Sequence, residues 1–304
     1  MEFLHKDKVQ FLEAINLSSY QTHILTPVVE KDYYVTMILR QLSETHPFVV
    51  FKGGTSLSKC HRVINRFSED IDITIDQNLS QGQKKKLKDA IIEIAKLLGM
   101  RITNLEDTKS RRDYNRYILE YDTVLPAQNT VVSPAVLIET SFVTISFPTS
   151  FIPVHSYMGD MMQKEAPEIL TEYGLDSFIM KVQGIDRTLV DKIFAVCDYY
   201  LQNKIKKHSR HLYDIYKLLP LVKQDENFCY LIREVRDIRA KSSICPSAQL
   251  GVDIPTLLQR ILDDKVYKED YENLTVKLLE EVVSYEEAMT AIEQVIHSGV
   301  FVKT

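Results

Sequence analysis

Two aspartates in the first third of the sequence have the type and spacing that metal-dependent chemistry needs. Asp70 directly precedes residues 71–76, a segment that contains Asp72 and in which isoleucine alternates strictly with polar residues. This alternation predicts a β-strand with both carboxylates on one face, about 6–7 Å apart, where they repel each other by about 2–3 kcal/mol at an effective dielectric near 20. A Mg²⁺ or Mn²⁺ ion would replace repulsion with coordination, because hard divalent cations prefer carboxylate oxygens. Taken alone, D-x-D is more often the solvated face of an edge strand, so the preceding residues must decide.

The residues before this strand favour the metal site. Residues 48–51 are apolar and predict a short buried strand. The Gly53-Gly54 turn that follows lets the backbone approach a ligand without a Cβ atom in the way. Residues 56–64 are expected to form a helix, and its first-turn N–H groups with the hydroxyls of Thr55 and Ser56 suit a phosphate. A phosphate site is therefore expected beside the metal site.

The same stretch resembles known nucleotidyltransferases. A Gly-Gly turn followed by D-x-D on the next strand is similar to the DNA polymerase β-type nucleotidyltransferase superfamily. The strings KGGTSLSK (52–59) and RFSEDIDI (66–73) resemble one branch of it, the AbiEii-type toxins of abortive-infection (type IV toxin–antitoxin) systems. An E-K-D helix start such as 30–32 also precedes the Gly-Gly strand in this branch, although such charges are ordinarily solvated. The resemblance implies metal binding by Asp70 and Asp72, and nucleotide contacts by Lys52, Gly53, Gly54, Thr55, Ser56, Lys59 and Ser68.

Further carboxylates and cations complete the expected site. Glu139 lies in the otherwise apolar and small residues 135–143, where a charge is costly unless it is paired or bound to metal. The superfamily takes a third carboxylate from a strand beside the D-x-D strand, so the resemblance implies this role for Glu139. The alternative is a strand-edge glutamate that points to solvent.

In the second half, R-T-L-x-D-K (187–192) and R-x-x-x-D (210–214) resemble the rest of the AbiEii-type pattern. The resemblance implies that Lys192 holds triphosphate oxygens, that Arg210 contributes to nucleotide binding, and that Asp214 orients the lysine or contacts the base or sugar. The alternative is a routine helix surface, on which Lys192 lies off the apolar stripe and Arg210 and Asp214 are i,i+4 neighbours.

Composition places the chain among ordinary globular proteins. Its 304 residues are 45% apolar and 26% charged, without a run long enough for a transmembrane helix or an apolar signal-peptide core at the N-terminus. The four cysteines are far apart and form no C-x-x-C pair, so we expect neither zinc nor disulfides but reduced thiols in a cytoplasm. A net charge of −5 argues against a general nucleic-acid-coating protein and leaves room for a local basic surface.

The expected fold class is α/β. A mixed sheet with flanking helices is predicted for residues 1–165, and a helical domain that completes the nucleotide cleft for residues 166–304. Residues 148–167 are expected to be an irregular connection, after which the chain is expected to be all helical. Helices are predicted at 6–16, 26–44, 84–98, 186–197 and 210–219, and further strands at 100–105, 116–121 and 135–143.

These patterns predict a metal-dependent nucleotidyltransferase that moves a nucleoside monophosphate from an NTP to an acceptor and acts as the toxin of a toxin–antitoxin or abortive-infection system. An RNA such as tRNA is the expected acceptor, because the basic segment 204–211, with Arg111 and Arg112, offers cations to phosphates. A cognate antitoxin that acts indirectly is the further expected partner, and no membrane is expected. Two alternatives stay open: a protein or small-molecule acceptor, and a non-catalytic nucleotide-binding protein.

Overall fold

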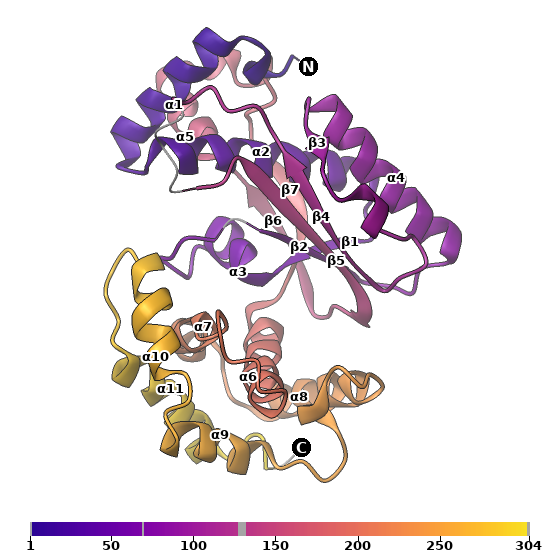
Figure 1. Cartoon of the computed structure of the whole chain (residues 1–304), viewed down its shortest axis with the longest axis vertical. Helices are drawn as coiled ribbons and strands as arrows, with labels where there is room; N and C mark the ends of the chain where they lie inside the picture. The colour runs from indigo at the N-terminus through magenta and orange to yellow at the C-terminus, as the bar shows by residue number, and fades with distance from the viewer. Residues whose placement is uncertain (1, 69, 127–131, 303–304) are drawn as a thin grey trace. The chain divides into compact units, whose positions relative to one another are not determined.

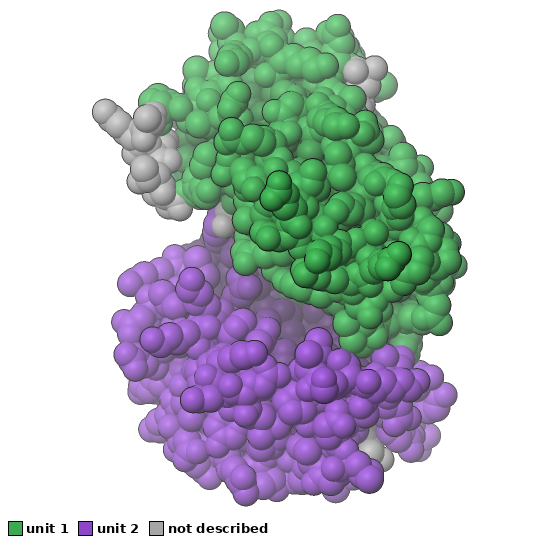
Figure 2. Space-filling model, turned by 45° about the vertical axis from the view of Figure 1, so that its right-hand side comes forward, with its two compact units in different colours: residues 1–60, 69–182 green, residues 61–68, 183–304 purple. Residues whose placement is uncertain are grey.

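Two compact units make up the chain. The structure, a computed structural model, describes residues 2–68, 70–126 and 132–302. Unit 1 comprises residues 1–60 and 69–182, and unit 2 comprises residues 61–68 and 183–304, as the colours of Figure 2 show. The chain therefore enters unit 2 briefly at residues 61–68, returns to unit 1, and enters unit 2 again after residue 182.

Unit 1 is built on a mixed seven-stranded sheet in the order β3-β4-β5-β2-β1-β7-β6 (Figure 1). Strand β2 runs antiparallel to β1 and parallel to β5, while β4 runs antiparallel to both β3 and β5. Strand β1 has β7 as its parallel neighbour on the other side. The strands are β1 (Val49–Lys52), β2 (Ile71–Ile75), β3 (Arg101–Ile102), β4 (Tyr114–Glu120), β5 (Ala135–Ile145), β6 (Thr149–Val154) and β7 (Phe178–Gln183).

Helices α2 and α4 lie along one face of this sheet (Figure 1). Ile71 and Ile73 of β2 join Leu39 of α2 and Ile91 of α4 in the buried core, so the isoleucine face of the predicted D-x-D strand is the core face. The polar residues of β2 consequently lie on the opposite face. The helices of unit 1 are α1 (Lys8–Thr22), α2 (Thr26–Thr45), α3 (Gly53–Ser56), α4 (Gln81–Leu97) and α5 (Tyr157–Glu165).

Unit 2 is helical. Helix α6 packs against α7, α8 and α9, and α11 packs against α7 and α9. A capping box at Ser284 and Glu287 begins α11. The helices are α6 (Ile185–Leu201), α7 (Arg210–Leu218), α8 (Glu226–Ala240), α9 (Ile254–Asp263), α10 (Lys268–Asp270) and α11 (Tyr285–Ser298).

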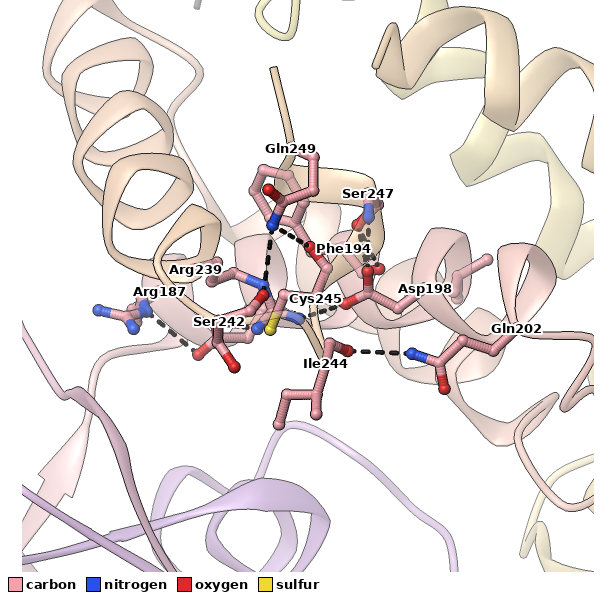
Figure 3. Close-up of polar contacts among 12 residues, drawn as sticks. Arg187, Phe194, Asp198, Gln202, Arg239, Ser242, Ile244, Cys245, Ser247 and Gln249 are labelled. Atoms are coloured by element: carbon pink, nitrogen blue, oxygen red, sulfur yellow. Dashed lines mark hydrogen bonds and ion pairs between the residues drawn. The ribbon is translucent and has the colours of Figure 1, made fainter. Parts of the chain in front are cut away.

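Buried polar contacts fix the loop that follows α8 (Figure 3). Asp198 of α6 accepts hydrogen bonds from the Ser247 hydroxyl at 2.7 Å and from Arg239 at 2.6 Å. The Gln249 amide donates to three backbone carbonyls, those of Ala240, Ser242 and Cys245. These bonds supply partners for polar groups that would otherwise be left unsatisfied in the interior.

The mixed sheet and flanking helices confirm the predicted fold class, but three local predictions were wrong. Residues 148–167 are not an irregular connection, because they contain β6 and α5. The chain beyond them is not all helical, because β7 adds a strand beside β1 and extends the sheet to Gln183. The helix expected at 56–64 instead begins at Gly53 as the four-residue α3 and continues as a π-helical turn over Leu57–His61.

The contacts divide at 182/183 and assign 61–68 to unit 2, whereas the sequence suggested domains of 1–165 and 166–304. Within the described part of the chain, no helix combines the length and the apolar character that a membrane crossing requires.

Candidate active site

A row of four charged residues crosses the sheet of unit 1 on one face. Register pairs join Lys52 of β1 to Asp72 of β2, Asp72 to Glu139 of β5, and Glu139 to Arg116 of β4. Residues paired in register on neighbouring strands project to the same face, about 4.7–5.5 Å apart at Cα. The row therefore reads cation, carboxylate, carboxylate, cation, with the two carboxylates at its centre.

Gly53 lies directly against the Asp72 carboxylate. Its φ of +77° is a conformation that L side chains rarely adopt, and a Cβ atom placed on it would lie 2.0 Å from Asp72 Oδ2. Only glycine fits here without displacing the aspartate. The close approach explains physically why a glycine must follow Lys52, and it is a contact that the Gly-Gly pattern alone could not specify.

Glu139 lies on a strand beside the D-x-D strand, as predicted. Its side chain is 33% exposed, and β5 lies between β2 and β4, so it does not occupy a sheet edge. The Arg116 guanidinium lies 3.7 Å from the Glu139 carboxylate. Burial and the nearby Glu139 charge raise the pKa of Tyr114, so its hydroxyl stays protonated. Glu139 is therefore paired rather than simply solvated.

The donor set suits a hard divalent cation. Asp72 and Glu139 are side by side in register, Asp70 directly precedes β2, and the Gly53 turn leaves the space that a Cβ atom would fill. Among the residues that the structure describes, no three carboxylate, imidazole or thiolate side chains stand close enough to hold a metal ion in their present positions. The chemistry and register of these carboxylates fit such an ion, and their side chains have to turn towards it.

The residues expected to bind phosphate differ in burial and in the unit to which they belong. Ser56 is fully buried, and its hydroxyl donates to the Gly53 carbonyl at 2.9 Å. Thr55 is buried, whereas Lys52, Gly54 and Ser68 are partly exposed, and Ser68 belongs to the segment of unit 2. Because α3 has four residues, the helix start predicted as a phosphate cradle is a single short turn.

Lys59 already has a carboxylate partner. Its ammonium group lies 2.5 Å from Asp32 of α2, and the second Asp32 oxygen accepts from the Tyr157 backbone N–H at the start of α5. Its side chain is 6% exposed. The pair thus joins three parts of unit 1, and nucleotide binding by Lys59 stays a prediction.

The E-K-D helix start of α2 is buried instead of solvated. Glu30 accepts from the Thr123 hydroxyl at 2.6 Å and from the Val124 N–H at 2.9 Å, while burial raises its pKa. Lys31 donates to the Ser133 carbonyl. These contacts hold the segment around residue 123, so packing within unit 1 accounts for the charged residues at 30–32.

In unit 2, Lys192 and Asp214 form a buried ion cluster with Arg66. Arg66 donates to both Asp214 oxygens, at 2.7 and 2.8 Å, and Lys192 donates to one of them at 2.6 Å. Asp214 is 0% exposed and Lys192 6%. The surface positions suggested by helical periodicity were therefore wrong. Arg210 begins α7 and is partly exposed.

The charges of this cluster determine how Asp214 ionises. Burial alone would raise the pKa of Asp214, but the two neighbouring cations outweigh it and hold that pKa well below its ordinary value. Asp214 is consequently a carboxylate at all physiological pH values. The segment 61–68 is tied to unit 2 by the Arg66 pair and by the Phe67 N–H, which donates to the Leu278 carbonyl.

Three residues of this arrangement were missed by sequence reasoning. Arg66 stands inside the RFSEDIDI string but had been given no role. Tyr114 and Arg116 are two apart on β4, whose buried and exposed residues alternate, and that alternation was the available signal that they share a face.

Comparisons with known proteins identify the family of the chain. The family model described as nucleotidyl transferase AbiEii toxin, Type IV TA system, matches residues 38–294, which include both the charge row and the buried ion cluster. No curated protein matches the chain. Among solved structures, it is similar to MenT4, a nucleotidyltransferase toxin from Mycobacterium tuberculosis H37Rv, with 16% identity and a TM-score of 0.49 over 90% of this chain and 84% of that one. On the family match, the chain belongs to the AbiEii nucleotidyltransferase toxins of type IV toxin–antitoxin systems.

Proposed function

We propose that this nucleotidyltransferase transfers a nucleoside monophosphate from an NTP to RNA, with Mg²⁺ or Mn²⁺ held by Asp70, Asp72 and Glu139. The observation that carries the proposal is the register of Asp72 beside Glu139, on a face that the core helices leave free. Lys52 and Arg116 flank the two adjacent carboxylates, and a divalent cation between them would turn their remaining repulsion into coordination.

The residues of unit 1 have separate roles in this proposal. A divalent cation bound to the carboxylates would neutralise charge on the triphosphate and lower the pKa of the acceptor hydroxyl. Lys52, at one end of the charge row, is placed to attract phosphate oxygens, and Gly53 keeps Asp72 in position. Fixed charges and positioning would supply most of the rate. Nucleotide contacts by Lys192, Arg210 and Asp214 stay predictions from the family pattern.

Exposed cations support RNA as the acceptor. Lys204, Lys206 and Lys207 are exposed, and the backbone beside them is held because Asp270 accepts from the N–H groups of Lys207 and Ser209. In unit 1, Arg111 and Arg112 are exposed as well. Cations on an ordered backbone lose less conformational freedom when they bind phosphates, so this segment suits a polyanion.

The cellular setting follows from these substrates and from the family. NTPs and RNA occur together in the cytoplasm, where we place the protein. A toxin of a type IV system has a cognate antitoxin, and we propose that this antitoxin acts indirectly rather than by covering the toxin. Co-expression should then restore growth without a stable complex in a pull-down.

The test is transfer of label from each NTP, labelled at the α-phosphate, in the presence of Mg²⁺ and total cellular RNA. Wild type should label RNA, and Asp72→Asn should abolish transfer with its melting temperature unchanged or raised, because the amide removes repulsion. The control is Asp89→Asn, which removes an exposed carboxylate paired with Lys85. Activity of Asp72→Asn equal to wild type would refute the metal site. Label on protein or on a small molecule would identify another acceptor, and NTP binding without any transfer would identify a non-catalytic protein.

A further inference from the structure

Arg116, at the outer end of the charge row, and Tyr114 beside it are two groups that the proposed reaction does not yet use. Arg116 and Tyr114 lie two residues apart on β4, so they project to the face that carries Glu139. Arg116 is the register partner of Glu139, and Tyr114 is the partner of Ser141, which makes Tyr114 the diagonal neighbour of Glu139. Both side chains are half exposed, at 50% and 49%, so neither is needed to fill the core.

Both groups lie beside the Glu139 carboxylate. The Arg116 Nε lies 3.7 Å from Glu139 Oε1, and Tyr114 is the diagonal neighbour of Glu139 on the same face, a position from which a long side chain can reach it. Both approach from β4, on the side of β5 opposite to Asp72. A carboxylate has two oxygens with several lone pairs, so a hydrogen bond from Tyr114 would leave acceptor capacity for a cation on the Asp72 side.

Glu139 needs such support more than Asp72 does. Glutamate has one more rotatable bond than aspartate, and the charge of Asp72 in the next strand favours rotamers that turn away from it. Gly53 already restricts Asp72 from the other side. Metal-binding carboxylates are generally oriented by hydrogen-bonding partners that do not touch the metal, and these partners contribute strongly to affinity.

We propose that Tyr114 and Arg116 are positioning residues that fix the Glu139 carboxylate as the third metal ligand. This inference rests on the proposed metal-dependent transfer. Tyr114 supplies direction through its hydroxyl, and Arg116 supplies a charge that offsets the repulsion between the two central carboxylates. Neither residue has to touch the nucleotide or the metal for this role.

The decisive experiment measures Mn²⁺ binding to the full-length protein without nucleotide, by the electron paramagnetic resonance signal of free Mn²⁺. Tyr114→Phe removes only a hydroxyl and should weaken Mn²⁺ binding about tenfold. In a Glu139→Gln background the same change should have no further effect, because its partner is gone. The matched control is Tyr117→Phe, on the same strand but buried at 2% on the core face, which should leave the affinity unchanged.

Arg116→Gln separates positioning from simple repulsion. A positioning role predicts weaker Mn²⁺ binding, whereas a cation that merely repels the metal predicts tighter binding on its removal. Tighter binding in Arg116→Gln would overturn the role of Arg116. Unchanged affinity in Tyr114→Phe, or an equal loss with and without Glu139, would overturn the role of Tyr114.

Asp72→Asn distinguishes failure of this inference from failure of the proposed function. If Asp72→Asn binds Mn²⁺ as wild type does, the carboxylates are not a metal site and both proposals fall. If Asp72→Asn loses binding while Tyr114→Phe and Arg116→Gln keep it, only the positioning role is wrong. Thermal melts of each variant establish that affinities are compared between folded proteins.

Discussion

Replacing Asp214 with asparagine tests the buried ion cluster most directly. The change keeps the shape of the side chain but leaves Arg66 and Lys192 without a counter-charge, at side-chain exposures of 2% and 7%. Removing one partner of a buried ion pair destabilises a protein by about 3–5 kcal/mol, because the remaining charge is uncompensated. Here two cations remain, so we expect the upper part of that range. For a domain of about 150–250 residues, 1 kcal/mol corresponds to about 2–4 °C, so about 4–5 kcal/mol gives a loss of roughly 8–20 °C.

The assay is thermal unfolding followed by circular dichroism, with urea unfolding as a second measure. The double variant Asp214→Asn/Lys192→Met should recover part of the loss, because it removes one of the two unpaired cations. Glu286→Gln, which breaks the exposed pair with Lys268 in the same unit, is the control and should change the melting temperature little. A melting temperature of Asp214→Asn within 2 °C of wild type would refute the reasoning.

The pH dependence gives an independent check of the sign. Because the folded-state pKa of Asp214 lies below its unfolded value near 3.9, its contribution is fully present above about pH 4 and is lost as the pH falls further. The part of the difference between wild type and Asp214→Asn that comes from ionisation of Asp214 should therefore be constant from pH 5 to 8 and shrink only in stronger acid. A difference that already disappears between pH 7 and 5 would point to histidines instead.

Three further predictions concern the glycine turn, RNA and the histidines. Gly53→Ala should lower transfer about 100-fold by displacing Asp72, whereas Gly99→Ala, also at positive φ but with nothing within 4 Å, should retain activity; equal losses would contradict this. The RNA association constant should fall by about 0.7 log unit per phosphate contact for each tenfold increase in salt concentration, and replacing Lys204, Lys206 and Lys207 with alanine should flatten that slope. Equal slopes for wild type and the triple variant would favour another acceptor. Burial lowers the pKa of His5 to about 4, so the stability of the protein should fall as the pH drops from about 6.5 towards 4. In thermal melts between pH 7.5 and 5, the melting temperature of His5→Gln should fall less than that of wild type. An identical fall would exclude His5 as the cause.

The parts of the fold that local patterns determine could be predicted from the sequence. Strict alternation in residues 71–76 identified β2 and its core face, because side chains in a strand alternate between faces. The apolar residues 135–143 predicted β5, and the resemblance to the nucleotidyltransferase superfamily implied that the strand of Glu139 lies beside β2. The first prediction depended on residues close together in the chain, and the second depended on the family resemblance.

The parts of the fold that depend on partners distant in the chain could not be predicted from the sequence. Helix α6 buries Arg187, Lys192 and Asp198 as well as its apolar residues, so a surface position inferred from its apolar stripe fails. The burial of Lys192 is tolerated because of Asp214, which in turn pairs with Arg66, 148 residues away. The place of strand β7 beside β1 follows from sheet pairing, which periodicity within the segment does not encode.

The early excursion of the chain into unit 2 has a consequence for the order in which the protein is made. Residues 61–68 leave the ribosome long before Asp214 and Leu278, the partners that hold Arg66 and Phe67. Strand β1 likewise keeps an open edge until β7 has been synthesised. Domains generally fold as units during synthesis, from the N-terminus onwards, but here neither unit can be completed by its early residues alone. The turn and strand that carry Gly53 and Asp72 thus gain their last sheet neighbour only once β7 has been made, and the segment 61–68 that joins them gains its partners later still.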